Sequence, residues 1–258
     1  MRSIFLIISM ILILGSCGSR SAQLQKAKAK ASFNIALSHF TLEKYQLALK
    51  FFRKARDLEP TNKEYQLHVA TLLLHLKEYE NAEMEFKKTC EMVKEFPACW
   101  NNYASLFIET NRVDQGIKYA RKAVESTAYQ TKDIAYANLG RAYLKKGEAV
   151  EALGWFDRAV QVNGANCTYR LLRVKALLRN LKFIEGLEEA KKSGIRCPLS
   201  WKSRAWEAYS FFKLGEIQRS MHILKDLGLR TKAIESKEYV VNSENRVRLN
   251  SPLEEPPI

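Results

Sequence analysis

The stretch DIAYANLGRAYLKKGEAVEALGWFDRAVQVNG, residues 133–164, indicates the fold of this 258-residue chain. Its first part carries apolar or small residues at i, i+3, i+4 and i+7, the spacing of one helix face: Tyr136, Leu139, Gly140 and Tyr143. A turn follows around Gly147, and a second helical face carries Ala152, Phe156 and Ala159. Small residues on one helix can receive large ones from the other, so the stretch predicts a tightly packed helical hairpin.

The same pattern recurs along the chain at a nearly constant spacing. Steps of 34 residues, with one step of 36, place the starts of six hairpins at Ala29, Lys63, Pro97, Asp133, Cys167 and Trp201. The last two frames deviate most from the pattern, as end repeats often do. A helical bundle with accidental similarity is the alternative, but a fixed period favours a stack of repeats.

Each hairpin resembles the tetratricopeptide repeat (TPR), whose pattern combines an early aromatic, a Leu-Gly pair, a Tyr and later an Ala, a Phe and a second Ala. Some frames depart from it, with Thr89 and Ala120 at second-helix positions and Gly164 where Pro is usual. The resemblance implies an all-α fold, a right-handed superhelical solenoid of about six TPR helix-turn-helix repeats over residues 29–228. We expect residues 229–258 to form a C-terminal cap and a disordered tail.

Residues 1–16 have the character of an export signal. A positive start precedes the apolar run from Ile4 to Leu14, which is shorter than the roughly 20 residues of a membrane-spanning helix. The ending Leu14-Gly15-Ser16-Cys17 resembles the bacterial lipobox, which implies cleavage before Cys17 and acylation of that residue. The alternatives are an ordinary signal peptide with an incidental cysteine and a short membrane anchor.

Residues 17–28 would then form the lipidated N-terminus and a short tether. Gly18 follows the cysteine where an Asp would favour inner-membrane retention, so the resemblance implies a lipid-anchored protein of the outer membrane that faces the periplasm. Three acyl chains exceed what stable membrane attachment requires.

Four cysteines remain beyond Cys17, and an exported protein meets an oxidising compartment. In a TPR hairpin the start of the first helix lies near the end of the second, which implies a disulfide between Cys167 and Cys197. A second pair, Cys90 and Cys99, flanks the junction of two repeats. The alternative is four buried free thiols.

The sequence contains no motif for catalysis, and we expect no enzyme activity, cofactor or metal. His39, His68, His75 and His222 are scattered, and carboxylate pairs such as Glu188-Glu189 fall on expected solvent faces. The formal net charge of +14 raises the possibility of a nucleic-acid ligand. Export argues against nucleic acid and favours an acidic protein partner or an anionic envelope component.

The TPR resemblance implies a concave face built from five positions of each first helix. We select from them a partner-binding groove of Phe33, Leu37, Phe40, Leu67, Leu74, Asn101, Arg141, Lys145, Lys175, Arg179, Tyr209 and Lys213. The same positions include Ile108, Leu144 and Thr168. The first half of this groove is apolar and the second half basic, which suits a protein segment with acidic and hydrophobic parts. The alternative is that the Lys and Arg side chains lie on solvated helix faces.

The lipobox, the six hairpins directly behind it and the chain length together resemble the outer-membrane TPR lipoproteins that act as pilotins for type IV pilus secretins. That resemblance implies a non-enzymatic factor that helps secretin subunits reach the outer membrane and assemble. A TPR lipoprotein that scaffolds or regulates a cell-wall or other envelope complex is the alternative, because TPR consensus residues are packing residues shared by all functions.

Overall fold

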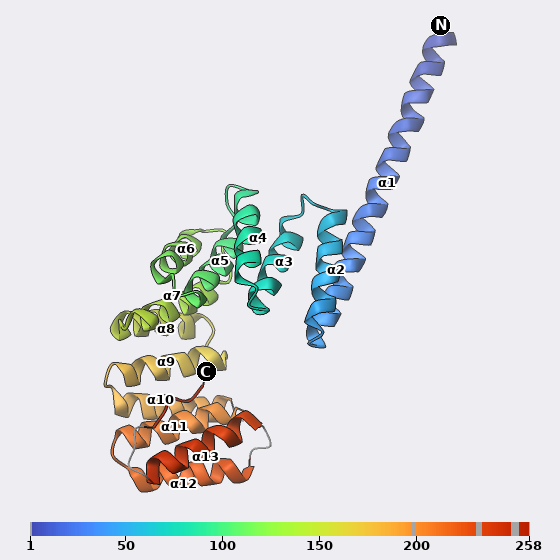
Figure 1. Ribbon diagram of the computed structural model, residues 1–258. Helices are drawn as coiled ribbons and strands as arrows, with labels where there is room; N and C mark the ends of the chain where they lie inside the picture. The colour runs from blue at the N-terminus through green and yellow to red at the C-terminus, as the bar shows by residue number, and fades with distance from the viewer. Residues whose placement is uncertain (1, 198–199, 231–233, 249–252, 258) are drawn as a thin grey trace. The chain divides into compact units, whose positions relative to one another are not determined.

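The structure, a computed structural model, describes residues 2–197, 200–230, 234–248 and 253–257, with side chains described for residues 21–197, 200–229, 238–246 and 253–257. The described residues form thirteen α-helices and no strand (Figure 1). The predicted all-α repeat solenoid is confirmed. The chain divides within α5 into two compact units, residues 1–106 and 107–258, which are described separately.

The first unit consists of hairpins, and α3 and α5 begin at the residues that the sequence period marks, Lys63 and Pro97. Its helices are α1 (Arg2–Thr41), α2 (Tyr45–Leu58), α3 (Lys63–His75), α4 (Tyr79–Glu91) and the first part of α5 (Pro97–Glu109). The first repeat starts inside α1, because the helix continues without interruption through the region expected to be a tether. Phe33 of α1 lies 4.9 Å from Tyr65 and 4.8 Å from His68 between ring centroids, so aromatic rings join the first repeat to the second.

The second unit continues the same succession of helices. They are the end of α5, α6 (Val113–Glu125), α7 (Lys132–Lys146), α8 (Ala149–Val162), α9 (Cys167–Arg179), α10 (Phe183–Arg196), α11 (Trp201–Lys213), α12 (Ile217–Arg230) and α13 (Ile234–Arg248). Each helix from α6 to α13 packs on the next one along the chain, and first helices also meet, α7 with α9 and α9 with α11 (Figure 1). Each hairpin therefore buries its apolar face against its neighbours.

The six hairpin turns share a backbone conformation that recurs with the sequence period. One residue in each turn has a positive φ between 57° and 82°: Glu43, Lys77, Asn111, Gly147, Leu181 and Gly215. Glycine adopts this left-handed conformation without steric cost, whereas other residues are strained in it. Four of the six turns therefore keep the geometry without the residue that suits it best.

The disulfide pairs proposed from the sequence are bonded in the structure. Cys90 and Cys99 have Cα atoms 5.5 Å apart, and Cys167 and Cys197 have Cα atoms 6.1 Å apart. The first pair joins α4 to the start of α5. The second joins the first residue of α9 to the residue after α10, so it ties the two ends of one hairpin together.

A buried ion network corrects one sequence-based expectation. Glu189 was placed on a solvent face, but its side chain is only 5% exposed. Its two carboxylate oxygens accept hydrogen bonds from Arg170 Nη1 at 2.8 Å and Arg173 Nη1 at 2.7 Å. Arg173 also pairs with Asp157 at 2.6 Å, so the network connects α8, α9 and α10. A carboxylate with two guanidinium partners can be buried where a lone one cannot.

The C-terminal segment also differs from the expectation of disorder. A full helix, α13, extends to Arg248, and its Tyr239 packs on the cluster around Trp206 and Tyr209. Leu253 belongs to this cluster and is 6% exposed. The disordered tail was inferred from polar and proline-rich composition, and that composition carries no sign of this long-range packing.

The lipid-anchor prediction falls outside what the structure describes. Cys17 lies in the part of α1 whose side chains are not described. Among the described residues, no helix combines the length and the apolar character needed to cross a membrane.

Candidate functional site

Four of the predicted cationic residues surround one hollow in the second unit. The hollow has a volume of about 650 Å³ and is formed by the end of α5 with α7 and α9. It is lined by Ile108, Arg141, Leu144, Lys145, Thr168, Leu172, Lys175 and Arg179. Aliphatic side chains thus lie among four cations, a surface suited to an acidic segment that also carries apolar groups.

The two cations from α7 are held in place by the end of α5. Lys145 Nζ donates a hydrogen bond to the backbone oxygen of Ile108 at 2.5 Å. Arg141 donates to Asn138 Oδ1 at 3.3 Å and lies 3.8 Å from the carboxylate of Glu109. Because these contacts use only some of the available donors, both side chains can still offer hydrogen bonds to a ligand.

The two cations from α9 lie one helical turn apart and share an acidic partner from the end of the chain. Lys175 Nζ lies 3.2 Å from Glu255 Oε2, and Arg179 Nε donates a hydrogen bond to Glu255 Oε1. Lys175 is 29% exposed and Arg179 59% exposed, so the pair lies at the rim of the hollow and not in the core. The structure thus brings the basic pair of α9 together on one carboxylate.

The pKa values at this carboxylate reflect the same contacts. Burial acts to raise the pKa of Glu255, but the hydrogen bond from Arg179 and the charge of Lys175 outweigh it, and the pKa lies below its ordinary value of 4.5. The hydrogen bond to Glu255 raises the pKa of Arg179. Both partners are therefore charged at neutral pH.

A second hollow of about 500 Å³ continues from Arg179 toward α11. It is lined by Leu178, Arg179, Leu181, Phe183, Tyr209, Lys213, Leu253 and Glu255. Tyr209 is 5% exposed and contributes mainly to the core, while Nζ of Lys213 lies 5.6 Å from the centroid of its ring. Burial, followed by the charge of Glu255, raises the pKa of the Tyr209 hydroxyl, so this residue is neutral in the site.

The predicted apolar half of the groove is largely wrong. Leu67 and Leu74 are 5% and 8% exposed, so little of their surface is available to a partner. The reason is that α3 packs against α2 on one side and α4 on the other and buries residues around most of its circumference. Asn101, the polar residue predicted for the same groove, is 1% exposed. Phe33 is also half-buried among aromatic rings.

Leu37 and Phe40 of α1 remain accessible in the first unit. They are 38% and 40% exposed. The ring centroid of Phe40 lies 5.5 Å from that of Tyr45 and 5.9 Å from that of His75. Two exposed apolar side chains make a small patch and do not form the continuous apolar groove that the sequence predicted.

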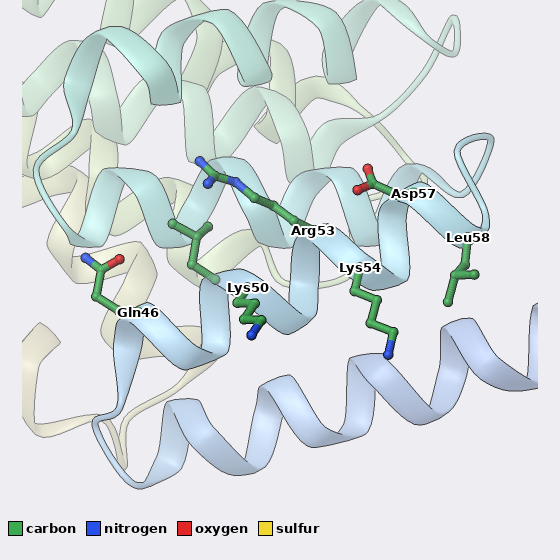
Figure 2. A pocket seen from close by; sticks show the side chains of 7 residues that line it. Gln46, Lys50, Arg53, Lys54, Asp57 and Leu58 are labelled. Atoms are coloured by element: carbon green, nitrogen blue, oxygen red, sulfur yellow. The ribbon is translucent and has the colours of Figure 1, made fainter.

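A separate pocket on α2 does not have the character of a binding site. All of its lining comes from this one helix: Gln46, Leu49, Lys50, Arg53, Lys54, Asp57 and Leu58 (Figure 2). In Figure 2 the side chains of Arg53 and Lys54 extend to opposite sides of the helix. Polar groups that diverge in this way cannot hold one ligand between them.

Among the lining residues that sequence reasoning missed are Leu253 and Glu255, which complete the second hollow. The only available signal was the acidic Glu254-Glu255 pair near the end of a strongly basic chain. Among the described residues, no group of three or more His, Cys, Asp or Glu side chains could hold a metal ion. Nothing in these residues indicates catalysis.

Comparison with known proteins establishes the family. A family model described as Tetratricopeptide repeat matches residues 33–97 and 101–166, just over half of the chain. The chain belongs to the TPR family. The matched segments lie within four of the six hairpins defined by the sequence period, and the helices of the remaining two follow in the same order with similar lengths of 13 or 14 residues.

Individual TPR proteins of similar fold include two type IV pilus proteins. The structure of PilF from Pseudomonas aeruginosa aligns with a TM-score of 0.68 at 16% identity and covers 84% of this chain and 99% of its own. The structure of PilW, described as a widely conserved type IV pilus biogenesis factor, aligns with a TM-score of 0.75 at 19% identity and covers 83% of this chain and 98% of its own. At these identities the likeness establishes the fold.

Sequence similarity to curated proteins covers shorter segments of the TPR array. The type IV pilus assembly protein PilF of Pseudomonas aeruginosa is 22% identical over 111 residues, which are 43% of this chain and 44% of that protein. The STIP1 homolog of Dictyostelium discoideum is 29% identical over 107 residues, 39% of this chain and 19% of that protein. The chain therefore spans less than half the length of these curated relatives.

Proposed function

We propose that this protein is a lipid-anchored TPR factor of the outer membrane that binds a protein segment and acts, in the manner of a pilotin, in the localisation and assembly of a type IV pilus secretin. The observation that carries the binding role is the hollow in which α7 and α9 present Arg141, Lys145, Lys175 and Arg179 around aliphatic side chains. Four cations with aliphatic side chains among them suit an acidic segment of another protein.

Two further observations support a pilus role. Nearly the whole length of PilF and of PilW aligns with most of this chain, so the similarity extends over most of the repeat array. The sequence ending in Cys17 supplies a site for lipid attachment directly ahead of the first hairpin. The acyl chains would fix the protein at the membrane while the TPR surface holds its partner.

The binding role is tested by co-purification from detergent-solubilised outer membrane. A variant with Arg141→Glu and Lys175→Glu reverses two charges of the hollow. The matched control is Lys118→Glu with Lys225→Glu, because both residues are exposed and lie on α6 and α12, outside the hollow. We expect the secretin to be recovered with wild type and with the control, and to be lost with the groove variant.

The other outcomes separate the parts of the proposal. Secretin that is retained by the groove variant would move the contact to another surface of the TPR array. A cell-wall enzyme or another envelope protein recovered in place of secretin would overturn the pilus assignment and favour the scaffold alternative. Circular dichroism of each variant verifies that the helices still form.

The lipid anchor is tested separately by metabolic labelling with palmitate. Wild type should incorporate label and sediment with outer-membrane fractions, whereas Cys17→Ser should incorporate none. Incorporation that survives Cys17→Ser would remove the lipobox assignment. The binding test does not depend on this result, because it can be repeated with purified protein added to solubilised membrane.

A further inference from the structure

The C-terminal residues 253–257 lie on the surface proposed to bind a partner. Residues 253–257 lie beside α9 (Figure 1), and Glu255 pairs with Lys175 and Arg179. Glu255 is separated from both cations by at least 76 positions in the sequence, so only the folded chain brings them together. Glu255 is therefore an acidic group from this chain in a groove suited to an acidic ligand.

The segment is anchored at three successive residues. Leu253 enters the apolar cluster of α9, α10, α11 and α12 and is 6% exposed. The backbone oxygen of Glu254 accepts a hydrogen bond from the Tyr239 hydroxyl at 3.4 Å, and its carboxylate accepts one from Arg246. Glu255 then meets the two cations of α9. The contacts are those of a short peptide ligand: an apolar anchor, a backbone hydrogen bond and a charge clamp.

The backbone of this segment has the form such a ligand would need. Residues 253–257 have no regular secondary structure, and Pro256 and Pro257 cannot donate the hydrogen bonds of a helix. In an extended chain, residues two apart point to the same side, which agrees with Leu253 and Glu255 both facing the TPR surface. The spacing of anchor and carboxylate is thus that of an extended peptide.

We infer that residues 253–257 act as an intramolecular ligand, which occupies the groove of α9 and α11 and competes there with an extended acidic segment of the partner protein. The inference rests on the proposed protein-binding function and specifies its ligand. The partner segment would carry an aliphatic residue two positions before a Glu or Asp, matching Leu253 and Glu255. Its continuation would reach Arg141 and Lys145 in the adjoining hollow, which residues 253–257 do not line.

Such an arrangement would restrict which partner segments can bind in the groove. A ligand segment on the same chain has an effective concentration on the order of millimolar. A partner segment must therefore bind better than the resident one to displace it, and contacts with Arg141 and Lys145 would provide the difference. An acidic peptide that binds more weakly than residues 253–257 would not displace them.

The experiment measures binding of a fluorescent peptide with the sequence SPLEEPPI, residues 251–258, to the full chain. In wild type the resident segment should block the peptide. Glu255→Lys places a cation beside Lys175 and Arg179, which should release the resident segment and raise the affinity for the added peptide about tenfold, the scale expected for loss of charge-assisted contacts. Glu238→Lys is the matched control, because Glu238 is exposed on α13, and this variant should bind like wild type.

Two further measurements make the result specific. Adding Lys175→Glu and Arg179→Glu to the Glu255→Lys chain should abolish binding of the peptide. A peptide with Lys in place of Glu255 should fail to bind the Glu255→Lys chain. If Glu255→Lys disturbs folding, as judged by its thermal melt, Glu255→Gln serves as the milder variant with a smaller gain in affinity.

Equal peptide affinity for wild type and for the folded Glu255 variants would overturn the inference, as would binding that persists without Lys175 and Arg179. Failure of this test with secretin still co-purifying would leave the proposed function in place without a resident ligand. If the peptide binds the variants as expected but no secretin co-purifies, the inference would stand and the pilotin role would be removed.

Discussion

Gly140 of α7 lies so close to the ring of Phe156 of α8 that a Cβ atom added to it would be 2.5 Å from Cε1 of that ring. Gly140 is buried and Phe156 has no exposed surface, so the two helices approach each other through this contact. The ring fills the space that any larger residue on α7 would require. Similar contact occurs in the next hairpin, where a Cβ at Gly186 would lie 2.6 Å from Cδ2 of Leu178.

Gly140→Ala should therefore destabilise the protein despite the higher helix propensity of alanine. Overpacking of a well-filled core costs about 1–3 kcal/mol, and the buried ring must shift to admit the new methyl group. Gly154→Ala is the matched control, since Gly154 lies in α8 and a Cβ added there would have nothing within 4 Å. The control should be stabilised by about 0.5–1 kcal/mol, because Gly is unfavourable within a helix. Urea denaturation followed by circular dichroism measures both, and equal effects of the two substitutions would contradict the packing argument.

The hairpin turns offer a stabilising substitution. Lys77 has a φ of 60° and an exposed side chain in the turn between α3 and α4. Left-handed backbone costs a non-glycine residue about 1–2 kcal/mol, so Lys77→Gly should gain about 0.5–1 kcal/mol after the greater freedom of glycine in the unfolded chain is counted. Lys77→Ala keeps the strain and removes the same side chain, so it should give no gain. Thermal melts distinguish the two, and a gain with alanine would assign the effect to the lysine charge.

The ion network around Glu189 should contribute strongly to stability. Glu189→Ala leaves the guanidinium groups of Arg170 and Arg173 without this partner, and the side chain of Arg170 is 10% exposed. Removing one partner of a buried pair costs about 3–5 kcal/mol. Glu188→Ala, at the exposed neighbouring position, should change stability by no more than about 0.5 kcal/mol. Chemical denaturation of the two variants gives the comparison, and similar values would show that the network contributes little.

The disulfide between Cys167 and Cys197 encloses a full hairpin, with a sequence separation of 30. Cross-linking a loop of this length stabilises by about 3–4 kcal/mol in the chain-entropy model. Cys167→Ser with Cys197→Ser should therefore lose about that much, whereas replacing Cys90 and Cys99, separated by 9, should lose less. Mass spectrometry of protein isolated without reductant verifies that the bonds form in the cell. Free thiols at all four positions would instead support buried cysteines.

Docking of residues 253–257 should depend on pH through Glu255. Its pKa in the folded chain lies below the ordinary value of 4.5, and Lys175 and Arg179 remain cationic in acid. The contribution of this carboxylate is therefore complete above about pH 4.5 and is lost as the pH falls through the lowered pKa. Hydrogen exchange of the C-terminal peptide should accelerate in that acidic range, after correction for intrinsic rates. Glu255→Gln should show no such step, and a step of equal size in this variant would assign it to another group.

Much of the fold followed from the order of residues alone. The period of 34 marks the first residues of α3, α5, α9 and α11 at Lys63, Pro97, Cys167 and Trp201, because each hairpin contacts mainly its neighbours and so repeats the same local requirements. The contact of Gly140 with Phe156 is another such local feature, since both residues lie within one hairpin. Packing within a hairpin can therefore be predicted from the sequence of that hairpin.

The groove depended on contacts between distant parts of the chain. Leu74 has the same repeat position as the exposed Phe40, but both Leu74 and Leu67 are covered by the helices on either side of α3. Glu255 meets Arg179 across 76 positions, and no periodic pattern relates an end segment to the repeats it covers. The repeat pattern was enough to predict the hairpins and the cations of α7 and α9. Only the folded chain showed which of those residues stay accessible and that an acidic segment of the same chain lies on them. The reason is that burial and charge pairing depend on all of a residue's neighbours in space.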